Sequence, residues 1–266
     1  MTAIVAKIML AGLPLAAAAA LLGCMIQWRG MSFAGDALAH SALLGVGLAL
    51  VIGVDWRVGV GAIALLMALH LHAGRGGGRL SADAVLAVSA HASLAAGACL
   101  LYLRRSSVDW ESILFGSILT VRTVEAVGLL LASGLIVVAG ALLWRRLVLL
   151  ALNDEIASIE NPRPALLELC FLLLLALYVT VGVRIVGVML LNAMLIIPVA
   201  AARPLAHSPA GMALLAAAIG MASMAAGTAL SFAADLPVAP ATALAACGAF
   251  VLTWGWDALR RRPAGK

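Results

Sequence analysis

The sequence predicts an all-α, polytopic membrane protein with about eight or nine transmembrane helices in a single domain, residues 1–266. Hydrophobic residues make up 65% of the 266 residues, whereas they make up about 45–50% of a soluble domain. Charged residues make up only 11%, and the mean hydropathy is +1.14. Apolar runs long enough to cross a bilayer fill nearly the whole chain, and short charged connections separate them.

Nine apolar runs are the predicted spans. The connections at 54–56 and 183 are very short, which leaves open whether the neighbouring segments are full spans, re-entrant segments or broken helices. In chain order the predicted spans are 4–27, 33–53, 57–73, 83–103, 124–148, 164–182, 184–203, 210–233 and 238–258.

The first run begins close to the N-terminus, and Lys7 is its only basic residue before Arg29. A secretory signal peptide has a basic n-region and a cleavage site of small residues, and neither is evident here. We therefore expect the first run to be a membrane span.

The second run carries the most informative pair of residues, Asp36 and His40. The spacing Asp36-x-x-x-His40 places both side chains on one face of a helix. An ionisable group inside a span costs at least about 2.5 kcal/mol and is by default a functional candidate. A carboxylate oxygen and an imidazole nitrogen are common ligands of transition metals. The pair predicts a metal-cation site, and the alternative is a structural pair that bonds neighbouring helices.

The third and fourth runs add further histidines. His70 and His72 alternate with leucine near the end of 57–73, so they point apart on a helix. His91 lies near the middle of 83–103, and we expect it to be a metal ligand or pathway residue, or else a core histidine. Asp83, near the start of that run, is a second pathway candidate, the alternative being a helix N-cap after Ser81.

Two longer connections flank the run 124–148. Residues 104–123 contain a short apolar stretch that predicts a surface or re-entrant helix. Residues 149–163 begin a helix at Asn153-Asp154-Glu155 and end at Asn161-Pro162. A short amphipathic helix in this position is a plausible docking element for a soluble partner.

Asn192 and Met194 are the candidates in the later runs, because both lie inside the apolar run 184–203. Either residue lines a pathway or contributes only to packing, where methionine often fills gaps. Pro198 is expected to kink its helix, which neighbouring helices tolerate in a membrane.

Basic residues set the expected orientation. The tail carries Arg260, Arg261, Arg262 and Lys266, which places the C-terminus in the cytoplasm under the positive-inside rule. Nine spans then place the N-terminus outside. The net charge of +5 comes mostly from such short connections, so it is not a sign of nucleic-acid binding.

The sequence lacks the motifs of two enzyme classes. The glycine run 74–78 is followed by Arg79-Leu80 rather than Lys-Ser/Thr, so it is not a phosphate-binding P-loop. H-E-x-x-H, the motif of zinc metalloproteases, is also absent. We therefore expect no ATP hydrolysis by the P-loop route and no zinc metalloprotease of this class.

Four ordered motifs resemble the ABC-3 family, the permeases of zinc and manganese ATP-binding-cassette importers. The resemblance covers essentially the whole chain, and the first motif resembles the zinc permease most closely. Ala87 departs from the second motif, where glycine is common. They read WRGMSFAGDALAHSALLGVGLAL (28–50), SADAVLAVSAHASLAAG (81–97), VDWESILFGSIL (108–119) and IVGVMLLNAMLIIPVAAAR (185–203).

The resemblance implies a homodimeric permease in the inner membrane of a bacterium, with two cytosolic ATPase subunits and an external metal-binding protein. It implies that Asp36 and His40 form the metal site. It also implies that the ATPase contacts a coupling segment beginning with Asn153, Asp154, Glu155, Ile156 and Ala157. The cargo is then Zn²⁺, because nitrogen ligands suit zinc better than the harder manganese, and no cofactor is held permanently. The alternatives are manganese or iron as cargo, a proton-coupled secondary metal transporter, and a permease for a chelated metal.

Overall fold

The computed structural model describes residues 2–73, 82–103, 115–116, 122–152 and 163–260. Within these ranges nine helices are long and apolar enough to cross a membrane. The predicted all-α, polytopic class and the predicted set of spans are therefore confirmed. The predicted coupling segment falls in residues 153–162, which lie outside these ranges. The structure therefore describes only the residues on either side of it.

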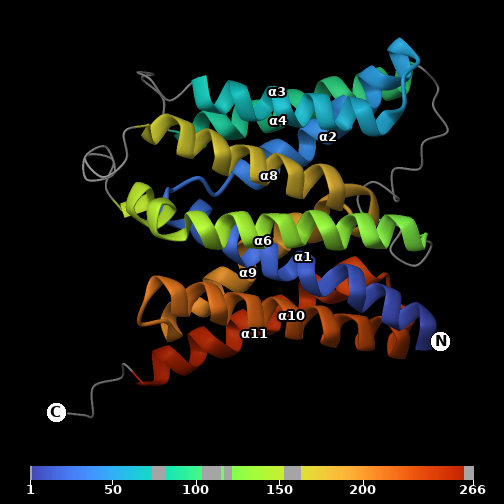
Figure 1. The fold of residues 1–266 in the computed structure, drawn as a ribbon. Coiled ribbons are helices and arrows are strands. Elements are labelled where there is room, and N and C mark those ends of the chain that lie inside the picture. Colours follow the sequence, from blue (N-terminus) through green and yellow to red (C-terminus); the bar gives the residue numbers. More distant parts are fainter. Residues whose placement is uncertain (1, 74–81, 104–114, 117–121, 153–162, 261–266) are drawn as a thin grey trace.

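The helices lie side by side and run along a common direction (Figure 1). A short 3-10 helix, η3 (Arg203–Leu205), follows α9. The long helices are α1 (Thr2–Trp28), α2 (Ala34–Ile52), α3 (Trp56–Ala73), α4 (Ala82–Leu103), α6 (Thr123–Leu152), α8 (Pro164–Val186), α9 (Val188–Ala202), α10 (Pro209–Ala234) and α11 (Val238–Arg260).

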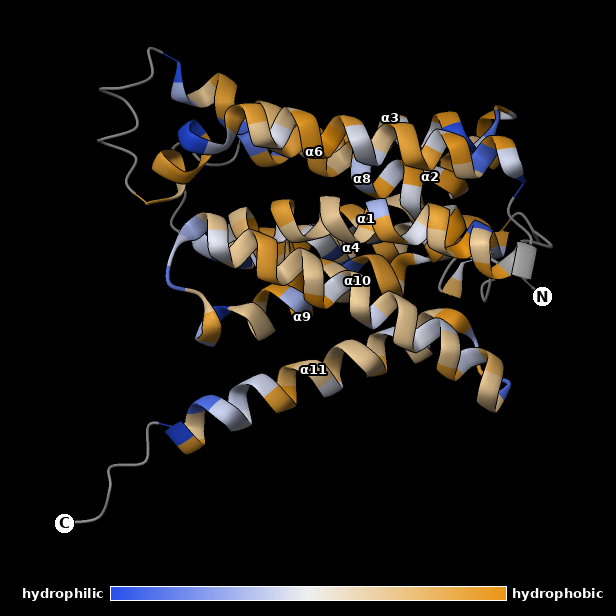
Figure 2. Cartoon of the chain, turned by 60° about the horizontal axis from the view of Figure 1, so that its bottom comes forward, coloured by the Kyte–Doolittle hydropathy of each residue, from blue (hydrophilic) through white to orange (hydrophobic). Residues whose placement is uncertain are grey.

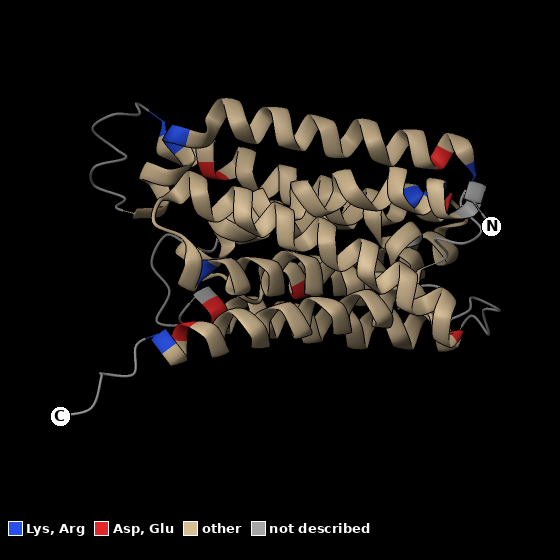
Figure 3. Cartoon of the chain, turned by 90° about the horizontal axis from the view of Figure 1, so that it is seen from below, with Lys and Arg blue, Asp and Glu red and all other residues tan. Residues whose placement is uncertain are grey.

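Hydropathy divides the bundle along its length. Apolar residues cover the long middle of the helices, and hydrophilic residues gather toward the helix ends (Figure 2). Lys, Arg, Asp and Glu likewise lie mostly at the two ends (Figure 3). Because a bilayer core excludes charge, this distribution is typical of helices that cross a membrane together.

The helices pack in two groups, and helix α9 contacts members of both. Helices α3 and α4 both pack on α2, while α10 packs on α1 and α11. Helix α9 lies between the groups, because it contacts α1, α2, α8, α10 and α11. Any residue of α9 that faces α2 therefore lies inside the bundle.

Glycines bring α2 close to both neighbours. A methyl group at Gly45 would lie 2.7 Å from the carbonyl oxygen of Gly59 on α3. A methyl group at Gly97 on α4 would lie 2.6 Å from the backbone nitrogen of Leu44. Such contacts between small residues allow helix backbones to approach closely in a membrane. They fix the position of α2, which carries Asp36 and His40.

The break between α8 and α9 differs from its expected place. The sequence predicts a break between the two spans at 183. In the structure α8 continues to Val186 and α9 begins at Val188. The reason is Gly187, whose φ of 83° and ψ of 156° are accessible essentially only to glycine. Gly116 packs against this break, because a methyl group there would lie 2.6 Å from the carbonyl oxygen of Ile185.

Candidate functional site

A tight turn positions the first candidate residues. Arg29 and Met31 donate backbone hydrogen bonds to the last turn of α1, and Gly30 has a φ of 61°. Helix α2 then begins at Ala34, so Asp36 lies in its first turn. Asp36 and His40 are both half-buried. They lie one helical turn apart, as the sequence predicts.

Asp36 is hydrogen-bonded to α9. The side-chain Nδ2 of Asn192 donates to Oδ1 of Asp36, so two residues predicted separately are brought together. The other amide atom of Asn192, Oδ1, is buried and has no hydrogen-bond partner among the described residues.

His91 approaches the same site from α4. His40 interacts electrostatically with both Asp36 and His91, so the three predicted ligands belong to one region of the bundle. The side chain of His91 is exposed in the single chain. Among the described residues, no three His, Cys, Asp or Glu side chains are close enough together to hold a metal ion. The structure therefore places the three predicted donors in one region without assembling them into a metal-binding cluster.

The remaining pathway candidates lie apart from this group. Asp83 is the second residue of α4 and lies two turns before His91, about 12 Å along the helix. Its Oδ1 is buried without a hydrogen-bond partner in the described ranges. Met194 is buried in the main hydrophobic core. It lies two positions after Asn192, so it points to a different side of α9.

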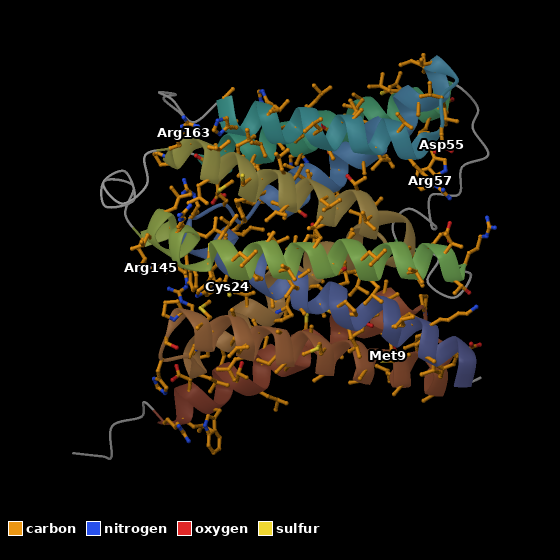
Figure 4. All side chains as sticks on the ribbon, viewed as in Figure 1. Met9, Cys24, Asp55, Arg57, Arg145 and Arg163 are labelled. Carbon is orange, nitrogen blue, oxygen red and sulfur yellow. The ribbon has the colours of Figure 1, made fainter. Side chains whose placement is uncertain are left out.

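The helix ends carry distinct groups of charged residues. Figure 4 shows Arg145 and Arg163 at one end of the bundle and Asp55 and Arg57 at the other. At the second end, Nη2 of Arg57 on α3 lies 3.1 Å from Oε1 of Glu125 on α6. This ion pair links two helices at the surface of the bundle.

Arg29 ties three helices together at the end that bears Arg163. Its Nη1 donates to the carbonyl oxygen of Leu150 on α6 at 3.0 Å. Its Nη2 lies 3.5 Å from Oε1 of Glu168 on α8. Helices α6 and α8 flank residues 153–162, which include Asn153, Asp154, Glu155, Ile156 and Ala157 and lie outside the described residues. The sequence analysis assigned no contact to Arg29, although the arginine is part of the first motif.

A hollow of about 270 Å³ opens at the same end. Trp28, Leu152, Arg203 and His207 are among the residues that line it. Leu152 is the last residue of α6, directly before the predicted coupling segment. The surface beside that segment is therefore concave and mixed in polarity.

Comparisons with known proteins agree with this arrangement. The sequence profile of the family described as "ABC 3 transport family" matches residues 1–255. The High-affinity zinc uptake system membrane protein ZnuB of Haemophilus influenzae is 29% identical over 248 residues, which are 92% of this chain and 94% of that protein. The Manganese transport system membrane protein MntC of Halalkalibacterium halodurans is 31% identical over 235 residues, 88% of this chain and 80% of that protein.

A solved structure has the same fold. PsaBC from Streptococcus pneumoniae, in complex with Fab, superimposes with a TM-score of 0.82 and 25% sequence identity. The match covers 94% of this chain and 91% of that one. The arrangement of helices described above is thus shared along nearly the whole length of both chains.

Proposed function

The chain belongs to the ABC 3 transport family, and from this premise we propose that it is the membrane-spanning subunit of an ATP-driven zinc importer. The observation that supports a metal cargo is the placement of Asp36, His40 and His91 on apolar helices, with His40 interacting electrostatically with the other two. Charged and polar groups at such positions are costly, so they are by default candidates for a transport pathway.

We further propose that two copies of the chain work with two cytosolic ATPase subunits and an external metal-binding protein. Metal enters from that protein, and Asp36, His40 and His91 replace part of its hydration shell. The donors must hold the ion well enough to capture it and weakly enough to release it, as in channels. The ATPase then acts on residues 153–157 and opens the path toward the cytoplasm.

Zinc is the proposed cargo because two of the three donors are imidazoles, which suit zinc better than manganese. The similarity to the zinc protein ZnuB over 94% of its length also supports this choice. Manganese is the second candidate, since MntC is 31% identical to this chain.

The test is uptake of radiolabelled zinc in cells that lack their own importer. The cells express the chain with its ATPase and binding protein, either unchanged or as Asp36→Asn or His40→Ala. We expect both variants to lose at least about tenfold in uptake, since each loses one of few ligands. Membrane levels of each variant are measured alongside.

The matched control is Ser133→Ala on α6. Its hydroxyl is buried without a hydrogen-bond partner among the described residues, so its removal perturbs a span without touching the site. Normal transport by both Asp36 and His40 variants would refute the metal site. Uptake of manganese but not of zinc would show that the cargo is manganese. Uptake that persists with an inactive ATPase would favour a secondary transporter.

A further inference from the structure

Asn192 has one amide atom satisfied and one unsatisfied. Its Nδ2 donates to Asp36, while its Oδ1 is buried without a hydrogen-bond partner among the described residues. A buried carbonyl oxygen without a partner costs about 1–3 kcal/mol. Such a group beside a carboxylate is suited to a cation, which an amide oxygen can bind.

The backbone around Asn192 holds it in this position. The hydroxyl of Tyr178, which is fully buried on α8, donates to the carbonyl oxygen of Leu191 at 3.3 Å. Helix α9 starts only four residues before Asn192, directly after the glycine break. The first turns of α9 are therefore attached to α8 and cannot shift freely relative to α2.

Gly35 provides the space that the amide needs. A methyl group at this position would lie 3.0 Å from Oδ1 of Asn192. That separation is shorter than an ordinary contact between a methyl carbon and an oxygen. The residue directly before Asp36 therefore determines where the amide oxygen lies.

We propose that Asn192 is an affinity-determining residue of the metal site, resting on the proposed function above. Its NH₂ group orients Asp36, and its carbonyl oxygen is a neutral ligand of the divalent cation. One carboxylate with neutral ligands leaves a net charge of +1 on the occupied site. That residual charge keeps the ion releasable, whereas a second carboxylate would neutralise it.

The test measures the KM and the maximal rate of zinc uptake for Asn192→Ala and Asn192→Asp, each in the complete transporter. Asn192→Ala loses a ligand and the donor to Asp36, so its KM should rise about tenfold to a hundredfold. Asn192→Asp adds a charged ligand, so its KM should fall at least about fivefold and its maximal rate should fall as well, because release slows. A merely structural asparagine would not move KM in opposite directions.

Two glycine variants test the same idea without changing a ligand. Gly35→Ala should raise KM as Asn192→Ala does, because its methyl group displaces the amide oxygen. Gly134→Ala on α6 is the matched control, since a methyl group there meets nothing within 4 Å. It should leave KM unchanged.

The outcomes separate this inference from the proposed function. If Asp36→Asn abolishes uptake but both Asn192 variants keep the original KM, or shift it in the same direction, the role of Asn192 is wrong and the metal site remains. If the unchanged transporter takes up neither zinc nor manganese, or if Asp36→Asn and His40→Ala transport normally, both proposals fail.

Discussion

Arg29 joins two parts of the molecule that carry different predicted roles. Its guanidinium contacts the last turns of α6 and the start of α8, on either side of the predicted coupling segment. Seven residues later in the chain lies Asp36. A displacement of α6 or α8 would therefore reach the turn before α2 through one side chain.

The first prediction concerns this residue. Arg29→Ala removes the ion pair with Glu168, whose side chain is 13% exposed, and the hydrogen bond to Leu150. We expect a loss of about 2–3 kcal/mol in stability. Under the proposed coupling through α6 and α8, we also expect zinc uptake to fall more than ATP hydrolysis. Both rates are measured in the same proteoliposomes.

Glu168→Gln provides the comparison, since it keeps the shape of the partner and removes its charge. A double-mutant cycle with Arg29→Ala isolates the coupling energy of the pair. Equal losses of transport and ATP hydrolysis in Arg29→Ala would contradict a linking role and leave only a structural one.

At the scale of elements, the break between α8 and α9 determines which face of α9 meets α2. Gly187 permits the break through a backbone conformation that other residues adopt only at a cost of about 1–3 kcal/mol. Two helices of ordinary apolar composition would otherwise join into one. The position of Asn192 therefore depends on a glycine five residues earlier.

The second prediction follows from this dependence. Gly187→Ala should lower the free energy of unfolding by about 1–3 kcal/mol and reduce zinc uptake, because it moves the first turns of α9. Thermal unfolding of the purified permease complex measures the first effect. Gly128→Ala, where a methyl group meets nothing within 4 Å, is the control. Unchanged stability and uptake in Gly187→Ala would show that the break does not need a glycine.

The spans themselves could be predicted from the sequence because length and apolarity alone decide them. The predicted run 33–53 and the helix Ala34–Ile52 differ by one residue at each end. The break could not be placed, since glycines lie at both 182 and 187 and the choice between them depends on backbone conformation. The Asn192–Asp36 bond could not be foreseen either, because it joins helices 156 residues apart.

At the scale of the whole molecule, the charged ends define two sides. Arg163 lies at one end and Asp55 at the other (Figure 4). Arg145 and Arg146 lie in the last turns of α6 on the side of Arg163, and Arg29 and Arg203 lie beside the end of that helix. Under the positive-inside rule we expect that side to face the cytoplasm.

The third prediction tests this orientation by cysteine labelling. In a background with Cys24, Cys99, Cys170 and Cys247 changed to Ser, Asp55→Cys should react with an impermeant thiol reagent in intact cells. Arg163→Cys should react only after the membrane is opened. Both residues are exposed, so burial does not limit either reaction. The reverse pattern would invert the topology.

The depth of Asn192 has an electrical consequence. Asn192 lies eleven residues before Arg203, about 16 Å along the helix, which is roughly half of a hydrocarbon core about 30 Å thick. A divalent cation that reaches this depth from outside has crossed about half of an evenly falling voltage. Moving one charge across 100 mV is worth about 2.3 kcal/mol. Two charges that cross half of an interior-negative voltage of about 100 mV therefore gain about 2.3 kcal/mol on loading, or roughly fiftyfold in occupancy. The membrane potential would thus help to fill the site before any ATP is hydrolysed.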